Sequence, residues 1–204
     1  MSRMKSVAAL GLVLLVSAAS LAGEGIAIGE TALKTDVKMK NIDGEMVSIA
    51  DVRGEKGVLV IFSCNQCPWV KGWETRMAAL GNKYQEKGIG VIMINSNDPA
   101  VSSEDSFEVM QKRAAQRGFE FAYVVDADSS MARAYGAKVT PEAFLFDASG
   151  KLVYHGTIDD NMRDESAVTK RYLRDALKSV AMGQDVAVQE TKSLGCSIKF
   201  RKTE

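Results

Sequence analysis

Short apolar runs alternate along the chain with stretches in which apolar residues recur at helical spacing. Residues 58–62 form a continuous apolar run rich in β-branched side chains, typical of a strand buried on both faces, and residues 89–94 predict a second such strand. Between them, the periodicity predicts an amphipathic helix that begins at Pro68, whose missing N–H suits a first turn, and ends at Gly88. Its apolar face comprises Trp69, Trp73, Met77, Leu80 and Tyr84.

Turn residues divide the rest of the chain into further short elements. Asp43-Gly44 predicts a β-hairpin between residues 37–42 and 46–49. Ser102 and Asp105 have the spacing of a capping box ahead of a helix that ends at Gly118. Further strands are expected at 121–125, 143–146 and 152–155, helices at 126–135 and 168–183, and a tail over 184–204.

This order of elements predicts one α/β domain over residues 23–204. Alternating strands and helices predict a mostly parallel central sheet with helices on both faces. The N-terminal β-hairpin and the late strands, joined by a turn, add antiparallel pairs, so the sheet is expected to be mixed. Chemistry gathers at the carboxyl ends of such strands, which is where Cys64 and Cys67 follow the strand at 58–62.

The first 22 residues have the pattern of a secretory signal peptide. Arg3 and Lys5 precede sixteen apolar or small residues, 7–22, which end in Ser20-Leu21-Ala22. The run is shorter than the roughly 18–20 residues of a membrane-spanning helix, so cleavage is favoured over the alternative of an uncleaved membrane anchor. We therefore expect an exported, periplasmic or otherwise extracytoplasmic protein with no membrane span after cleavage.

Charge and cysteine content narrow the functional classes. The 204 residues carry 26 basic and 26 acidic side chains, and loss of residues 1–22 leaves a net charge of −2. That balance argues against nucleic-acid binding by bulk charge. Three cysteines are too few for a disulfide scaffold, which makes the spacing of Cys64 and Cys67 the informative feature.

A C-x-x-C pair between a buried strand and a helix is usually a redox pair rather than a zinc half-site. Free N–H groups and the helix dipole at a helix N-terminus stabilise a thiolate, which is the reactive form of cysteine. We expect Cys64 to be the exposed attacking sulfur and Cys67 the resolving sulfur. Thr140-Pro141 precedes a strand and is a candidate for a cis peptide bond.

These residues resemble the thioredoxin-like superfamily, and more closely a redoxin group in its AhpC/TSA, peroxiredoxin-like branch, over nearly all of residues 29–200. The matching motifs are Phe62-Ser63-Cys64-Asn65-Gln66-Cys67-Pro68, Gly136-Ala137-x-x-Thr140-Pro141-Glu142, Tyr154-x-Gly156-x-Ile158-Asp159-Asp160 and Gly195-Cys196-Ser197-Ile198-Lys199. The resemblance implies a thioredoxin-like fold with thiol–disulfide or antioxidant chemistry. It also implies that Pro141 is a cis-proline and that Thr140 offers backbone hydrogen bonds to a substrate near Cys64.

The chain departs from the related families at three points. Val58 stands six residues before Cys64, where thioredoxin has a buried aspartate, so Glu55, Lys56 or another group would have to accept the proton. The peroxiredoxin box P-x-x-x-T-x-x-C is absent, which weakens a peroxidase function. Val139 stands where many relatives in the group have a cysteine.

The remaining candidate residues have structural as well as functional interpretations. Cys196 is either a third redox thiol or a buried structural cysteine. His155, the only histidine, is more often structural at the end of a strand than a base or ligand. Trp69 is a candidate for substrate contact beside Cys64, whereas Trp73 is expected in the core. Asp159-Asp160 is expected to be a solvated turn.

The preferred function is an exported thiol–disulfide oxidoreductase that needs no cofactor. Its expected partners are thiols or disulfides of proteins or small molecules, with an unidentified redoxin as electron donor. A peroxiredoxin-like peroxidase acting on peroxide is the alternative. A non-catalytic copper or zinc module on the same fold is a third hypothesis, in which Cys64, Cys67, Cys196 and His155 would supply a zinc site's four ligands.

Overall fold

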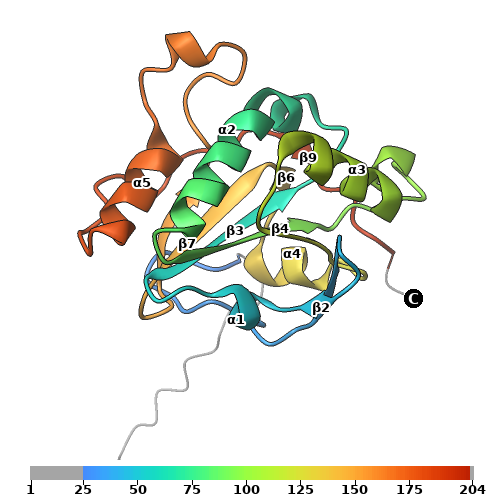
Figure 1. Ribbon diagram of the computed structural model, residues 1–204, viewed down its shortest axis with the longest axis horizontal. Coiled ribbons are helices and arrows are strands. Elements are labelled where there is room, and N and C mark those ends of the chain that lie inside the picture. The colour runs from blue at the N-terminus through green and yellow to red at the C-terminus, as the bar shows by residue number, and fades with distance from the viewer. Residues whose placement is uncertain (1–24, 203–204) are drawn as a thin grey trace, which may run out of the picture.

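The computed structural model describes residues 25–202, so the predicted signal segment lies outside the described residues. A seven-stranded sheet with the order β2-β1-β5-β4-β3-β7-β8 forms its centre (Figure 1). The strands are β1 (Met39–Asn41), β2 (Met46–Val47), β3 (Gly57–Ser63), β4 (Ile89–Asn95), β5 (Ala122–Val125), β7 (Glu142–Asp147) and β8 (Leu152–Gly156). The predicted N-terminal hairpin is β1 and β2.

The sheet is mixed, as expected, but it is not mostly parallel. Only the β3–β4 and β4–β5 pairs run parallel, and the other four pairs within the described sheet are antiparallel. The reason is that both ends of the parallel centre are extended by hairpins. The hairpin of β1 and β2 adds to β5, and the hairpin of β7 and β8 adds to β3.

Helices cover both faces of the sheet (Figure 1). On one face, α2 (Pro68–Gln85), α3 (Phe107–Arg117) and α5 (Tyr172–Ala181) contribute to a core that contains the fully buried Trp73. On the other face, α1 (Ile49–Val52) and α4 (Ser130–Tyr135) pack with alternate residues of the same strands. Residues 58–62 are buried throughout, which explains their continuous apolar sequence.

Several boundaries differ from the sequence prediction. Ser48 and Asp51 form a capping box that starts α1, so the second strand of the hairpin ends before residue 49. Ser102 and Asp105 bond to each other around a 3₁₀ turn (Ser103–Asp105), and α3 begins only after Ser106. The last helix likewise begins at Tyr172 rather than at Val168, behind a second 3₁₀ turn (Glu165–Ala167).

The C-terminal segment is not a free tail. Within it β9 (Cys196–Ser197) pairs antiparallel with β6 (Val139–Thr140), forming a second, two-stranded sheet (Figure 1). The amide of Ile198 donates to the carbonyl of Lys138 at 3.0 Å, and Ile198 is buried in the core. Among residues 25–202, the helices are all too short or too polar to span a bilayer.

Candidate active site

The two cysteines of the C-x-x-C motif lie between β3 and α2, as predicted. Cys67 is the residue that precedes the first turn of α2, and Pro68 occupies that turn. Cys64 and Cys67 are 3% and 4% exposed, so the expectation that Cys64 is the exposed sulfur is wrong for this reduced state. The physical reason is that the loop before Pro141 lies over both sulfurs.

The Thr140–Pro141 peptide bond is cis, as the resemblance implied. It brings Thr140 against both cysteines. The Thr140 hydroxyl lies 3.0 Å from Cys64 Sγ, and the Thr140 carbonyl oxygen lies 3.1 Å from Cys67 Sγ. One residue of the proline loop therefore contacts both members of the predicted redox pair.

Cys196 belongs to the same site, although 129 positions separate it from Cys67 in the sequence. Its Sγ lies 2.7 Å from Cys67 Sγ. The contact follows from the pairing of β6 and β9, in which Cys196 lies opposite Thr140. Cys196 is partly exposed, unlike Cys64 and Cys67. The three cysteines of the chain thus meet beside the cis-proline.

The three thiols have unlike acidities. The pKa of Cys67 falls from 9.0 to about 5, chiefly because the Cys64 thiol donates to it. Burial acts in the opposite direction and raises this pKa. Donation from the Cys196 thiol and from the Val70 N–H lowers it further. The pKa of Cys64 rises, because its proton is held by Cys67 and because burial disfavours its charge. Burial and the proton shared with Cys67 raise the pKa of Cys196 to about 11. Of the three thiols, Cys67 alone has its pKa lowered, and those of Cys64 and Cys196 are raised.

The buried carboxylate of Asp105 supports the turn between the cysteines, although no sequence motif marks it as a site residue. Asp105 accepts a hydrogen bond of 2.6 Å from the backbone N–H of Asn65, and it also binds Asn97 and Ser102. The Asn65 side chain is fixed in turn by the hydroxyl of Tyr123, at 3.0 Å. Asp105 was visible in the sequence only as a helix-capping residue, because its partners come from distant segments.

The proposed substitutes for thioredoxin's aspartate lie elsewhere. Glu55 and Lys56 precede β3, at the end of the strand opposite the cysteines, where the Lys56 N–H donates to the carbonyl of Gly88. Val58 is buried in the core. Neither charged residue is therefore placed to exchange a proton with Cys64 or Cys67.

Glu142, directly after the cis-proline, holds the loop in place. Its carboxylate accepts the backbone N–H groups of Lys138 and Val139 at 2.8 and 3.2 Å, and the hydroxyl of Ser193 at 3.1 Å. It also pairs at 2.7 Å with Nε2 of His155. Burial would raise the pKa of Glu142, but these hydrogen bonds outweigh it and hold that pKa below its usual value.

His155 is structural, as its position at the end of a strand suggested. Its ring stacks on Phe144 with centroids 4.4 Å apart, and Nε2 is occupied by Glu142. It does not join the three sulfurs, so the four-ligand zinc set is not assembled. Over residues 25–202 as a whole, His, Cys, Asp and Glu form no cluster of three or more suited to a metal ion.

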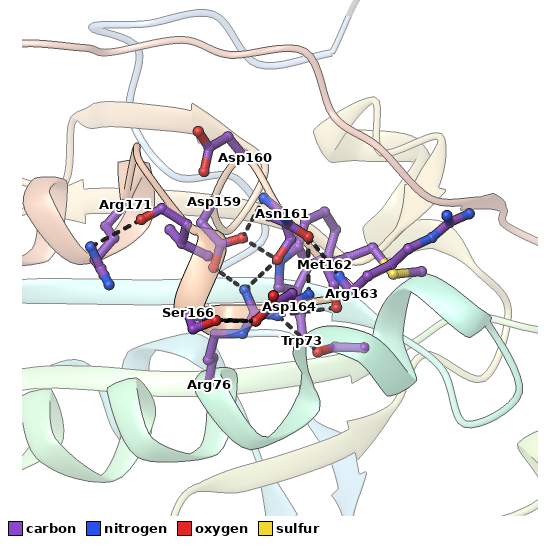
Figure 2. Close-up of polar contacts among 12 residues, drawn as sticks. Trp73, Arg76, Asp159, Asp160, Asn161, Met162, Arg163, Asp164, Ser166 and Arg171 are labelled. Atoms are coloured by element: carbon purple, nitrogen blue, oxygen red, sulfur yellow. Dashed lines mark hydrogen bonds and ion pairs between the residues drawn. The ribbon is translucent and has the colours of Figure 1, made fainter.

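Asp159 is buried rather than solvated, which corrects the sequence expectation. It accepts the indole N–H of Trp73 at 2.7 Å and the backbone N–H of Asn161 at 3.0 Å, and it forms an ion pair with Arg76. Figure 2 shows Arg76 reaching from α2 to this loop. Both aspartates were expected to be exposed, and of the two only Asp160 is.

The two tryptophans divide as expected from the helix pattern. Trp73 is fully buried, whereas Trp69 is only partly buried and lies against it with ring centroids 5.6 Å apart. The backbone N–H of Trp69 acts to lower the pKa of the Cys196 thiol. Trp69 therefore borders the cysteine cluster, with Gln66 and Pro68 exposed beside it.

Comparison with known proteins agrees with this geometry. Residues 28–155 match the model of the AhpC/TSA family. Thiol-disulfide oxidoreductase ResA of Halalkalibacterium halodurans is 26% identical over 129 residues, which are 62% of this chain and 69% of the relative.

Solved structures extend the comparison to most of the chain. A crystal structure of a hypothetical protein from Sinorhizobium meliloti 1021 is 33% identical and has a TM-score of 0.81, covering 88% of this chain and 98% of that protein. The thioredoxin domain of a thiol-disulfide oxidoreductase from Bacteroides vulgatus shares the fold, with a TM-score of 0.52 at 23% identity over 64% of this chain and 88% of that one. The chain therefore belongs to the AhpC/TSA family and is an oxidoreductase with a thioredoxin-like fold.

Proposed function

We propose that the protein is an exported thiol–disulfide oxidoreductase that uses Cys64 and Cys67 as its redox pair. Within the AhpC/TSA family we place it in the redoxin group with a C-N-x-C-P box, which here is residues 64–68. The observation that carries the proposal is the contact of both sulfurs with Thr140, next to the cis-proline. The relatives named thiol-disulfide oxidoreductase ResA support the same reaction class.

In the proposed reaction Cys64 attacks a disulfide of a protein or small molecule. Cys67, the thiolate of the reduced site, takes the proton of the Cys64 thiol as attack begins. One S–S bond breaks and a mixed disulfide forms on Cys64, and the departing substrate thiolate takes up the proton from Cys67. The Cys67 thiolate then attacks Cys64, which releases the second substrate thiol and leaves the Cys64–Cys67 disulfide.

Thr140, Pro141 and Trp69 would form the substrate contact. The Thr140 hydroxyl already lies against Cys64, and a substrate that displaces this contact gains access to the sulfur. Trp69, Gln66 and Pro68 present the partly exposed or exposed surface beside the cluster. An external dithiol, provided by an electron-donor redoxin, would return the oxidised pair to its reduced form.

Trapping separates the roles of the two cysteines. The protein without residues 1–22 should reduce a model disulfide, and Cys64→Ser should abolish this activity. In Cys67→Ser, Cys64 should accumulate a mixed disulfide with the substrate, detectable as the corresponding mass increase on the peptide of residues 57–71. A mixed disulfide that accumulates on Cys67 in Cys64→Ser instead would contradict the assignment.

The same preparations test the peroxidase alternative. Peroxide consumption that persists while disulfide reduction is absent would overturn the proposed reaction. The missing P-x-x-x-T-x-x-C box leads us to expect negligible consumption, measured with hydrogen peroxide and a thiol reductant.

Export rests on the composition of residues 1–22. We expect the full-length chain, expressed in a bacterial host, to be recovered from the periplasm with Gly23 at its N-terminus, as shown by intact mass. Recovery of the uncut chain in the membrane fraction would support an anchor instead.

A further inference from the structure

The three sulfurs form a row with Cys67 in the middle. On one side Cys67 and Cys64 both contact Thr140, at 3.1 and 3.0 Å, and on the other side the Sγ of Cys67 lies 2.7 Å from that of Cys196. A disulfide bond is about 2.05 Å long, so a small movement brings Cys196 to bonding distance of Cys67. Cys67 is therefore positioned to form a disulfide with either neighbour.

The position of Cys196 is built by the surrounding chain. Gly195 is packed so closely against the proline loop that a Cβ atom there would come within 2.3 Å of the Thr140 carbonyl oxygen. On either side, Ser193 donates to Glu142, and the Lys199 N–H donates to the Asn97 side chain at 2.8 Å. The strand is thus fixed at three places, and the contact between Cys196 and Cys67 is a consequence of the fold.

The N-terminus of α2 serves the same two sulfurs. The backbone N–H of Val70 lowers the pKa of Cys67, and the backbone N–H of Trp69 lowers that of Cys196 against the burial that raises it. These N–H groups have no partner within the helix and carry its positive partial charge. The helix end that was expected to activate Cys64 therefore stabilises negative charge on Cys67 and Cys196.

We propose that Cys196 is a third redox thiol and that the oxidised site transfers its disulfide from Cys64–Cys67 to Cys67–Cys196. This proposal rests on the proposed function of Cys64 and Cys67. The partly exposed Cys196 would then be the sulfur through which an external dithiol restores the enzyme, while Cys64 faces the substrate.

The exchange is balanced and consumes no oxidant. The Cys196 thiolate attacks the Cys67 sulfur, so the Cys67–Cys196 bond forms as the Cys64–Cys67 bond breaks. The electron pair leaves on Cys64, which takes up a proton equivalent to the one that Cys196 lost. The donor dithiol then attacks Cys196, and its second thiol closes the donor's own disulfide, which leaves Cys67 and Cys196 reduced.

Disulfide mapping tests the geometry without depending on activity. After oxidation with diamide, Cys64→Ser should yield a link between the tryptic peptides 57–71 and 193–199 in monomeric protein, whereas Cys67→Ser should not. Wild-type protein, partly oxidised and quenched with N-ethylmaleimide, should contain molecules with Cys64 alkylated and the same link present. Absence of the link from both Cys64→Ser and the wild type would overturn the proposal.

Kinetics test the role of the link. With a dithiol donor, Cys196→Ser should lower steady-state turnover by about tenfold or more, since recharging would depend on buried sulfurs, while a single turnover of reduced enzyme stays within about twofold. Ser197→Ala, an exposed neighbour in the same strand, is the matched control and should leave both unchanged.

The two sets of results separate the proposals. Equal steady-state turnover in Cys196→Ser and wild type would overturn the relay even where the Cys64–Cys67 reaction is intact. Loss of disulfide reduction in the wild type would instead contradict the proposed function itself.

Discussion

The pKa of Cys67 is lowered because more hydrogen-bond donors converge on it than on its neighbours. The Cys64 thiol, the Cys196 thiol and the Val70 N–H all favour its thiolate, against the cost of burial. Three effects raise the pKa of Cys64: the hydrogen bond with Cys67, burial, and the nearby charge of Asp105. A cysteine pair that looks symmetrical in the sequence is therefore electrostatically unequal in the fold.

This inequality predicts the titration of the reduced protein. Thiolate absorbance near 240 nm should rise by about one thiolate around pH 5, and the rest should appear only above pH 9, since the pKa of Cys196 is raised to about 11. The first step should be missing from Cys67→Ser and present in Ser63→Ala. A first step near pH 9 in the wild type would contradict the assigned charge.

The sign of the accompanying stability change follows from the lowered pKa of Cys67. The group contributes stability fully above its unfolded pKa of 9.0, and the contribution disappears as the pH falls through about 5. The difference in free energy of unfolding between reduced wild type and Cys67→Ser should therefore shrink between pH 9 and pH 5.

Individual residues were predictable where a local pattern defined them. Cys64, Cys67 and the cis bond before Pro141 follow from spacing and from a family resemblance. Asp105 and Glu142 have no such pattern, because each binds backbone and side chains that only the folded chain brings together. Exposure was misjudged for Cys64 because the loop that covers it comes from 76 residues away.

At the scale of elements, a buried carboxylate binds two side chains of α2. Asp159 joins the indole of Trp73 to the guanidinium of Arg76, one helical turn apart on α2 (Figure 2). The two charged side chains of this ion pair are only 11% and 5% exposed. Removing one charge leaves the other buried without an opposite charge, which is more costly than losing a surface pair.

Two neighbouring aspartates allow a matched test of this clamp. Asp159→Asn should lower the free energy of unfolding by about 3 kcal/mol, as for a broken buried ion pair. Asp160→Asn, at an exposed position bonded to Thr169, should cost less than about 1 kcal/mol. Urea denaturation of both variants measures the difference, and equal losses would contradict a special role for Asp159.

Strands and helices with strong periodicity were predicted close to their observed positions, and the short elements were not. β3, β4 and α2 were evident from continuous or helical apolar patterns. β6 and β9 have two residues each and exist only because they pair with one another. A two-residue strand is too short to show an alternating hydrophobic pattern. The C-terminal segment was therefore predicted to be a tail.

At the scale of the whole molecule, the sheet and the site depend on different parts of the chain. The seven strands of the main sheet end with Gly156, whereas Cys196 arrives from the C-terminal segment. The α/β class and the mixed sheet could be predicted from element order. The direction of the pairs could not, because it depends on which edge each hairpin joins.

Removal of residues 193–204 should therefore open the site without unfolding the domain. Among residues 193–202, Ile198 is the only fully buried hydrophobic residue, so the free energy of unfolding should fall by about 2–4 kcal/mol while the far-ultraviolet circular dichroism remains native-like. Cys64 and Cys67 should react with Ellman's reagent about tenfold faster or more, since reactivity depends on access.

The full-length variant Cys196→Ala is the control for this truncation, because it loses the thiol and keeps the strand. It should retain the slow reaction of the buried pair. Equal reaction rates in the truncated and full-length chains would show that β9 is not needed to hold the loop before Pro141 over the cysteines.

The late position of Cys196 also has a consequence for biosynthesis. A chain that emerges from its N-terminus completes the central sheet at Gly156, forty residues before Cys196 becomes available. In the oxidising compartment proposed above, Cys64 and Cys67 would meet first, and an oxidant of that compartment would take their two electrons as the disulfide closes on the nascent chain. The newly made protein would thus be oxidised at first. It would have to react with a reductant before it could reduce a substrate disulfide.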